Sequence, residues 1–208
     1  STYWFGLELR GADDAPTDWL LQIAYPPLDS VKVFVYSKGG TLTASYETGD
    51  RVPFQERPIQ NRNYLFPITV EPHVAVEVLV RVQQLGADVV EVPLALVNAS
   101  RLAEEEAVPI VFDGIYAGIM LVMGIYNLFL FLFLRDRSYL DYVGFVAAIA
   151  LFLLGLRGWT AQYLWPDAIA WKQVSYPVIL TGGSCCMLVF SSQLLELRES
   201  MPRFARFL

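Results

Sequence analysis

Twenty consecutive residues without a charge, Ile115 to Leu134, constrain this chain more than any other feature of its sequence. The run ends abruptly at Arg135-Asp136-Arg137. An α-helix rises about 1.5 Å per residue, so about 20 apolar residues are needed to cross the hydrocarbon core of a bilayer. We therefore expect a membrane-spanning helix, and with it a lipid bilayer as a partner of the chain.

Two further apolar stretches follow this run. We expect about three transmembrane helices, at approximately residues 112–134, 140–156 and 174–195. Five arginines flank these helices on one side of the membrane, and three basic residues flank them on the other. Because basic residues favour the cytoplasmic side, the N-terminal part is predicted to lie outside and the polar, aromatic segment 157–173 to form an outer loop.

The residues before the first helix show a different pattern. Every second residue from Val74 to Val82 is valine, and Val31, Val33 and Val35 alternate in the same way, which indicates half-buried strands. Clusters of Gly, Pro and Asp separate the strand-like runs. We predict an antiparallel jelly-roll or β-sandwich domain over residues 1–98, joined by a polar linker, residues 99–111, to the membrane region, residues 112–208. The expected strands are Tyr3–Leu9, Trp19–Tyr25, Val31–Tyr36, Asn63–Val70, Val74–Gln83 and Val89–Val97.

Charge is distributed unequally between the two parts of the chain. Residues 1–111 hold 15 acidic and 8 basic side chains, and residues 112–208 hold 6 and 7, so the net charges are −7 and +1. An acidic domain does not attract nucleic acid, which we exclude as a partner. The only cysteines, Cys185 and Cys186, are adjacent within an apolar run, so the N-terminal domain folds without a disulfide.

Residues for catalysis are scarce. His73 is the only histidine, and it follows Pro72 in an expected turn. The sequence contains no Gly-rich phosphate loop, no CxxC and no HExxH pattern. We expect no enzymatic activity in this chain, no metal site and no cofactor.

Two groups of residues are candidates for ligand binding. Trp4, Trp19, Tyr25 and Phe34 are proposed to form an aromatic platform on which flat sugars stack; the alternative is that they fill the core or its rim. Asp50, Arg57 and Arg81 combine guanidinium and carboxylate groups that clamp a hydroxylated or anionic ligand. Ion pairs that pin long loops explain the same three residues.

Three residues of the first helix are candidates for helix packing. Gly114 and Gly118 have the GxxxG spacing that permits close approach of another helix, and Asn127 carries an amide that needs a partner inside a membrane. Packing within one bundle explains all three, and a homodimer stays open as an assembly state. No ionisable residue lies in the middle of a span, which argues against a transporter.

Several fragments of the chain resemble the bacterial seven-transmembrane receptors with diverse intracellular signalling modules. In the first part they are Tyr3-Trp4-Phe5, Trp19-Leu20-Leu21, Tyr25-Pro26-Pro27-Leu28-Asp29, Thr48-Gly49-Asp50, Arg57-Pro58-Ile59 and Leu79-Val80-Arg81-Val82, similar to that family's extracellular type 2 domain. In the second part they are Gly118-Ile119-Met120, Tyr126-Asn127-Leu128-Phe129 and the stretch 134–142, similar to the start of its seven-helix region.

This resemblance implies a jelly-roll sensor domain, similar to carbohydrate-binding modules, in the periplasm above helices in the bacterial inner membrane. It also implies a signal to a cytoplasmic effector, a histidine kinase or diguanylate cyclase, of a full-length protein. The chain supplies about three crossings of seven and no effector, so we expect a fragment or a truncated relative. Our hypothesis is a sensory module that binds a small, sugar-like ligand; the alternative is a membrane-anchored protein–protein interaction module.

Overall fold

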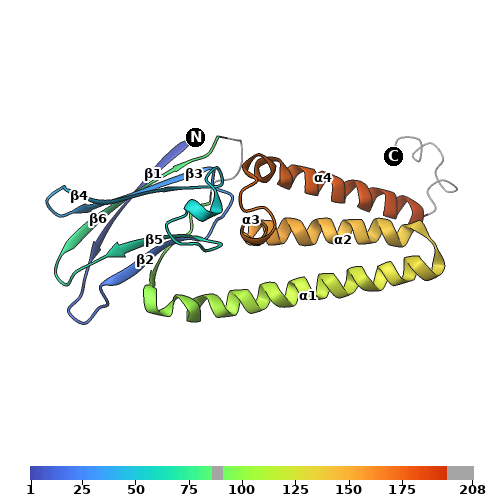
Figure 1. The fold of residues 1–208 in the computed structure, drawn as a ribbon, viewed down its shortest axis with the longest axis horizontal. Helices are drawn as coiled ribbons and strands as arrows, with labels where there is room; N and C mark the ends of the chain where they lie inside the picture. Colours follow the sequence, from blue (N-terminus) through green and yellow to red (C-terminus); the bar gives the residue numbers. More distant parts are fainter. Residues whose placement is uncertain (86–90, 196–208) are drawn as a thin grey trace. The chain divides into compact units, whose positions relative to one another are not determined.

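The computed structural model describes residues 1–85 and 91–195 (Figure 1). The chain forms two compact units. The first consists of Ser1–Ala107 together with Leu156–Gln173, and the second of Val108–Gly155 together with the chain from Val174 onward. A short segment that lies between two apolar helices in the sequence therefore belongs to the same unit as the N-terminal β domain.

Among the described residues of the first unit, seven strands form two antiparallel sheets, so the predicted all-β N-terminal domain is confirmed. Four strands have the order β1-β6-β3-β4, and three have the order β5-β2-β7. The strands are β1 (Thr2–Arg10), β2 (Asp18–Ile23), β3 (Ser30–Ser37), β4 (Leu42–Thr48), β5 (Tyr64–Thr69), β6 (Ala75–Gln83) and β7 (Leu94–Asn98).

The core of this domain contains side chains from both sheets. Alternate valines of β3 and β6 are buried, as the period-two pattern predicts, with Val33, Val78 and Val80 fully inaccessible. They belong to one cluster with Ile23 and Phe66 of the three-stranded sheet. The remaining residues of β3 and β6 therefore point away from the core, onto the outer face of the four-stranded sheet.

The strands differ from the sequence-based expectation at two places. Strand β4 was not predicted, because its inward side chains, Ala44, Tyr46 and Thr48, lack the β-branched apolar repeat; an edge strand needs less of it. Strand β7 begins only after Pro93, because proline has no N–H to donate to a neighbouring strand. The first two residues of that predicted strand, 89 and 90, lie outside the described residues.

The helices are α1 (Leu102–Leu134), α2 (Arg137–Leu156), the short α3 (Trp159–Tyr163) and α4 (Ile169–Leu194). Within the described residues, three helices are long and apolar enough to cross a membrane, as predicted. A 3₁₀ turn, η2 (Ala99–Arg101), precedes α1, and the Asn98 side chain accepts a hydrogen bond from the Ser100 amide, 2.9 Å. Helix α1 begins at Leu102, so helical structure extends through the end of the segment predicted as a linker.

In the second unit, α2 and α4 lie close together at two glycines. A Cβ atom at Gly144 would lie 2.9 Å from Cys186 Sγ, and one at Gly183 would lie 2.7 Å from Ala148 Cβ. By contrast, no heavy atom lies within 4 Å of such a Cβ at Gly114 or Gly118. The predicted role of these two glycines in helix packing therefore stays a prediction.

The buried amide of Asn127 is satisfied within its own helix. Its Nδ2 donates to the Met123 carbonyl oxygen at 2.8 Å, one turn earlier in α1. Such a bond removes much of the cost of placing an amide in an apolar environment. It also means that Asn127 does not need a neighbouring helix to supply an acceptor for that N–H group.

Candidate functional site

Three of the predicted ligand-binding side chains meet on the outer face of the four-stranded sheet. Trp4 of β1 pairs in register with Arg81 of β6, and Phe34 of β3 lies one row further along. The Trp4 and Phe34 rings are 6.3 Å apart between centroids, with their planes only 20° from parallel. The Arg81 guanidinium carbon is 6.0 Å from the centre of the Trp4 ring. We call Trp4, Phe34 and Arg81 the sheet platform.

The strand pattern explains why Trp4 of the sheet platform is open to solvent. Outward positions alternate with the buried valines, and Trp4 remains 58 % exposed. Gly6, the next outward residue on β1, adds no side chain beside Trp4. Polar side chains occupy other outward positions on the same face. Arg81 Nη2 donates to Gln83 Oε1 at 3.0 Å, and Lys32 forms an ion pair with Glu47 at 2.9 Å.

This arrangement suits a flat ligand with polar groups at its edge. The C–H face of a sugar ring packs on exposed, nearly parallel aromatic rings, while its hydroxyl groups accept and donate hydrogen bonds. Arg81 provides donors and Glu47 acceptors on the same face of the sheet.

Trp19 and Tyr25 do not join the sheet platform. Trp19 belongs to β2 of the other sheet, where its Nε1 donates to the Pro16 carbonyl oxygen at 2.7 Å. Both rings pack against the core and are partly buried, which is the alternative that the sequence left open. Their predicted role in ligand binding stays a prediction.

Asp50 and Arg57 lie in a second cluster, formed by the loop between β4 and β5. Arg57 is only 5 % exposed, and its guanidinium carbon is 4.7 Å from the Phe54 ring centre and 4.6 Å from that of Tyr64. Its Nη1 donates to the carbonyl oxygens of Asn61 and Arg62, at 2.8 and 3.2 Å. Arg57 therefore holds the loop between β4 and β5 through hydrogen bonds to backbone carbonyl oxygens.

Charged groups from distant parts of the chain surround Asp50. This carboxyl is buried, and both Lys172, at the start of α4, and Arg57 act on it electrostatically. Burial raises the pKa of Asp50 above its ordinary value of 3.8, and the positive charges of Lys172 and Arg57 oppose that shift only in part. The cluster therefore favours a protonated Asp50 more than water does.

The raised pKa predicts how Asp50 affects stability. The folded state binds this proton more tightly than the unfolded chain, so the stabilisation is complete below the ordinary pKa and is lost as the pH rises through the raised one. We expect the unfolding free energy of the wild type, minus that of Asp50→Asn, to fall with rising pH. Urea unfolding between about pH 3 and 8 measures this difference. A difference that rises with pH would contradict the assignment.

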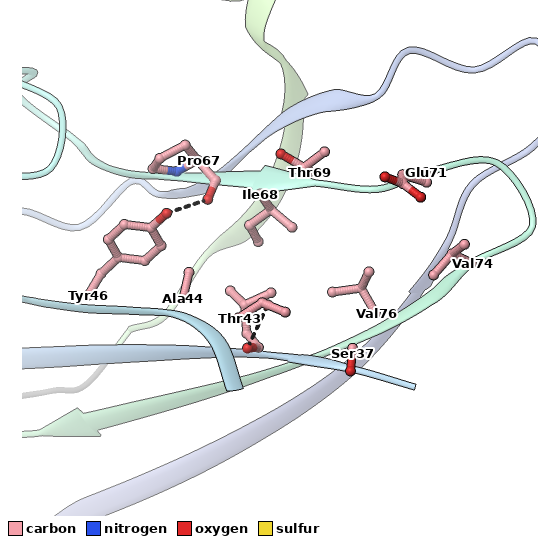
Figure 2. A pocket seen from close by; sticks show the side chains of 11 residues that line it. Ser37, Thr43, Ala44, Tyr46, Pro67, Ile68, Thr69, Glu71, Val74 and Val76 are labelled. Carbon is pink, nitrogen blue, oxygen red and sulfur yellow. Dashed lines mark hydrogen bonds between the residues drawn. The ribbon is translucent and has the colours of Figure 1, made fainter. Parts of the chain in front are cut away.

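A cavity of about 360 Å³ is a third feature of the domain, and the sequence did not predict it. Its lining comes from both sheets, with buried Val35, Ile68 and Val76 together with hydroxyl groups and one carboxylate, Glu71 (Figure 2). The Tyr46 hydroxyl bridges the sheets there by donating to the Pro67 carbonyl oxygen at 2.9 Å. Cavities that hold small ligands typically have about 300–1,000 Å³. No local sequence signal marks this cavity, because it depends on which strands lie opposite one another.

Two family models match this chain, one for each part. A model described as 7TMR-DISM extracellular 2 matches residues 1–97, which include both the sheet platform and the cavity. A model described as 7TM diverse intracellular signalling matches residues 110–208, with the apolar helices. The chain belongs to the 7TMR-DISM family.

Membership of the 7TMR-DISM family identifies the chain as an extracellular sensory domain joined to a seven-transmembrane signalling module. The predicted family resemblance is therefore confirmed over nearly the whole sequence. A search of the curated proteins and a search of the solved structures found no significant match.

Proposed function

We propose that the domain of residues 1–98 senses a small carbohydrate, which binds on the sheet platform. This domain would then lie in the periplasm as part of a bacterial inner-membrane receptor. The signal would pass through the membrane helices to a cytoplasmic histidine kinase or diguanylate cyclase. The observation that carries the proposal is the exposed Trp4 ring, nearly parallel to the half-buried Phe34 ring and beside the Arg81 guanidinium.

Exposure of a large aromatic ring supports a binding role for Trp4. A tryptophan that is 58 % exposed leaves much apolar surface in water, and a ligand that covers this surface gains free energy. The neighbouring Lys32–Glu47 pair and Arg81 offer the hydroxyl groups of a sugar both donors and acceptors. A purely apolar partner would leave these polar groups without water, so the face favours a hydroxylated ligand.

Binding alone would not produce a signal. A ligand shifts an equilibrium between two conformations only when it binds one of them more tightly than the other. The three side chains of the sheet platform come from three adjacent strands, so their spacing depends on the conformation of the sheet. A change in the twist or register of these strands would alter the spacing of the two rings and the affinity for a rigid sugar ring.

The second candidate is a protein-interaction module. An exposed sheet face with one large aromatic residue also suits a protein partner, because aromatic side chains and arginine are enriched in protein interfaces. The cavity beside Tyr46 favours a small ligand over a protein, since it is concave and lined by hydroxyl groups and a carboxylate. We therefore place the small-ligand function first.

Titration calorimetry of the full chain in nanodiscs against a panel of mono- and oligosaccharides tests this proposal. For a saccharide that binds, Trp4→Ala is expected to raise Kd about ten- to hundredfold, because an aromatic contact at the centre of a binding face is removed. Tyr3→Ala is the matched control, since Tyr3 is the adjacent aromatic residue of β1 and its side chain points to the opposite side of the strand. We expect this control to leave Kd unchanged.

Other outcomes would reassign the ligand or the function. A saccharide whose affinity is insensitive to Trp4→Ala but is lost in Ala44→Phe, which fills the cavity beside Tyr46, would move the site to the cavity and overturn the sheet platform. No binding by any saccharide, together with a protein partner whose binding requires Trp4, would replace the carbohydrate proposal with the interaction module.

A further inference from the structure

The segment of residues 156–173, which runs from the last residue of α2 through α3 to the first residues of α4, packs on the β domain through its backbone. We call it the α2–α4 connection. The Phe54 amide donates to the Pro166 carbonyl oxygen at 3.3 Å. Gly158 has a left-handed φ of 81°, and a Cβ atom there would lie 2.8 Å from the Arg62 carbonyl oxygen and 2.9 Å from Pro26 Cγ. The two backbones approach so closely at Gly158 that only glycine fits.

Side chains extend this contact on both sides of Gly158. The Arg62 guanidinium carbon lies 5.0 Å from the centre of the Trp159 ring, and Arg62 is only 6 % exposed. Thr160 and Ala161 of α3 are buried as well. A buried cation over the face of a tryptophan ring is among the stronger forms of this interaction. The contact is therefore specific in geometry and shielded from water.

Lys172 adds an electrostatic link at the other end of the connection. Its side chain is 2 % exposed, and its charge acts on Asp50, which is also buried. Moving either group away would leave the other buried without the group that acts on it, which is costly. Lys172 acts on Asp50 electrostatically, and the loop of residues 50–63 contacts the α2–α4 connection through Phe54 and Arg62. We call it the coupling loop.

The coupling loop also contacts the start of α1. Asn61 Nδ2 donates to Glu106 Oε2 at 3.0 Å, and Asn63 Nδ2 lies 3.5 Å from Glu106 Oε1. Glu106 lies in the part of α1 that belongs to the first unit. One loop of the β domain therefore contacts chain segments that lead into three helices, namely α1, α2 and α4.

We propose that the coupling loop is the output surface of the sensor domain, which acts on the start of α1 and on the α2–α4 connection at the same time. A change in the β domain then reaches three membrane helices together rather than only the one that follows it in the sequence. This inference rests on the proposed sensory function. Its test needs no ligand, so it succeeds or fails independently of carbohydrate binding at the sheet platform.

Reciprocal coupling is the measurable signature of such a surface. If two segments stabilise each other, loosening either one must loosen the other by the same free energy. Local opening is read from amide hydrogen exchange, which reports the free energy of opening residue by residue. The informative amides are those of Phe54 and Arg57 in the coupling loop and of Leu164 and Trp165 in the connection, which all donate hydrogen bonds.

The experiment is hydrogen exchange of the full chain in nanodiscs. Trp159→Leu is expected to speed exchange at Phe54 and Arg57 about tenfold, and Arg62→Lys to do the same at Leu164 and Trp165. Trp171→Leu is the matched control, because it removes a tryptophan of the same connection whose ring contacts Trp165 instead. It is expected to leave Phe54 and Arg57 unchanged.

The link to α1 has its own pair of variants. Glu106→Gln is expected to speed hydrogen exchange at the backbone amides of Asn61 and Asn63, because it weakens the bonds that their side chains make to Glu106. Glu104→Gln, two residues earlier on α1, is expected to leave this exchange unchanged. Unaltered exchange in β3 and β6 shows that a variant keeps its sheets folded. The proposal is overturned if Trp159→Leu leaves the coupling loop unchanged with folded sheets, or if both tryptophan variants speed its exchange equally.

Discussion

Replacing Arg57 by alanine is expected to lower the free energy of unfolding of the β domain by about 3–5 kcal/mol, the range for breaking a buried charge interaction. The guanidinium is packed between the Phe54 and Tyr64 rings and donates hydrogen bonds to two carbonyl oxygens. Its loss also removes a positive charge that acts on the buried Asp50 carboxyl. The slowest-exchanging amides of β3 and β6 measure this free energy in the full chain.

Two further variants separate the causes of the Arg57 effect. Arg51→Ala removes a partly exposed arginine of the same loop, whose Nε lies 3.2 Å from Asp29 Oδ1, and is expected to cost less than about 1 kcal/mol. Arg57→Lys keeps the charge but loses the planar group between the two rings, so an intermediate loss is expected. Equal losses in Arg57→Ala and Arg51→Ala would show that burial of Arg57 contributes nothing.

Gly158→Ala is expected to detach the α2–α4 connection from the coupling loop at a cost of about 2–4 kcal/mol. Two penalties combine, because an L-residue with a φ of 81° is strained and its Cβ would overlap the Arg62 carbonyl oxygen. The expected result is faster exchange at Leu164 and Trp165, with smaller changes in β3 and β6. The same nanodisc exchange measurement detects it.

Gly40 provides a close control for this variant. Its φ of 77° nearly equals that of Gly158, but no atom lies within 4 Å of a Cβ placed there. Gly40→Ala therefore isolates the cost of the left-handed backbone, about 1 kcal/mol, from the cost of the overlap. If Gly40→Ala and Gly158→Ala lowered the free energy of unfolding by the same amount, close packing at Gly158 would be ruled out as the cause.

The repetitive parts of this fold follow from its sequence. Alternating valines place β3 and β6 with their buried faces correctly, because burial in a sheet has a period of two residues. The uncharged run from Ile115 identifies a membrane helix because the bilayer sets its length. Periodicity does not predict strand β4, because its inward residues Ala44, Tyr46 and Thr48 form no apolar repeat at the sheet edge.

The candidate site was predictable only residue by residue. Trp4, Phe34 and Arg81 were each identified from chemistry, but their proximity depends on strand order. The N-terminal strand β1 pairs with β6, which is 77 residues away for the Trp4–Arg81 pair. Local periodicity contains no information about such long-range pairing. For the same reason Trp19, on the other sheet, could not be separated from Trp4 in advance.

Packing in the helical unit shows the same limit. The GxxxG spacing predicts helix packing at Gly114 and Gly118. The close contacts between α2 and α4 involve Gly144 and Gly183 instead. Spacing along one helix shows that a small-residue surface exists, but not which helix covers it. The sequence alone therefore does not predict which helices contact one another.

The close fit at Gly158 has a consequence for anyone who wishes to exchange sensor domains between receptors of this family. A transplant cut only after residue 107 would carry the coupling loop but leave behind its counterpart, residues 156–173. The transferable module is discontinuous, and a working hybrid has to inherit both pieces from the same parent.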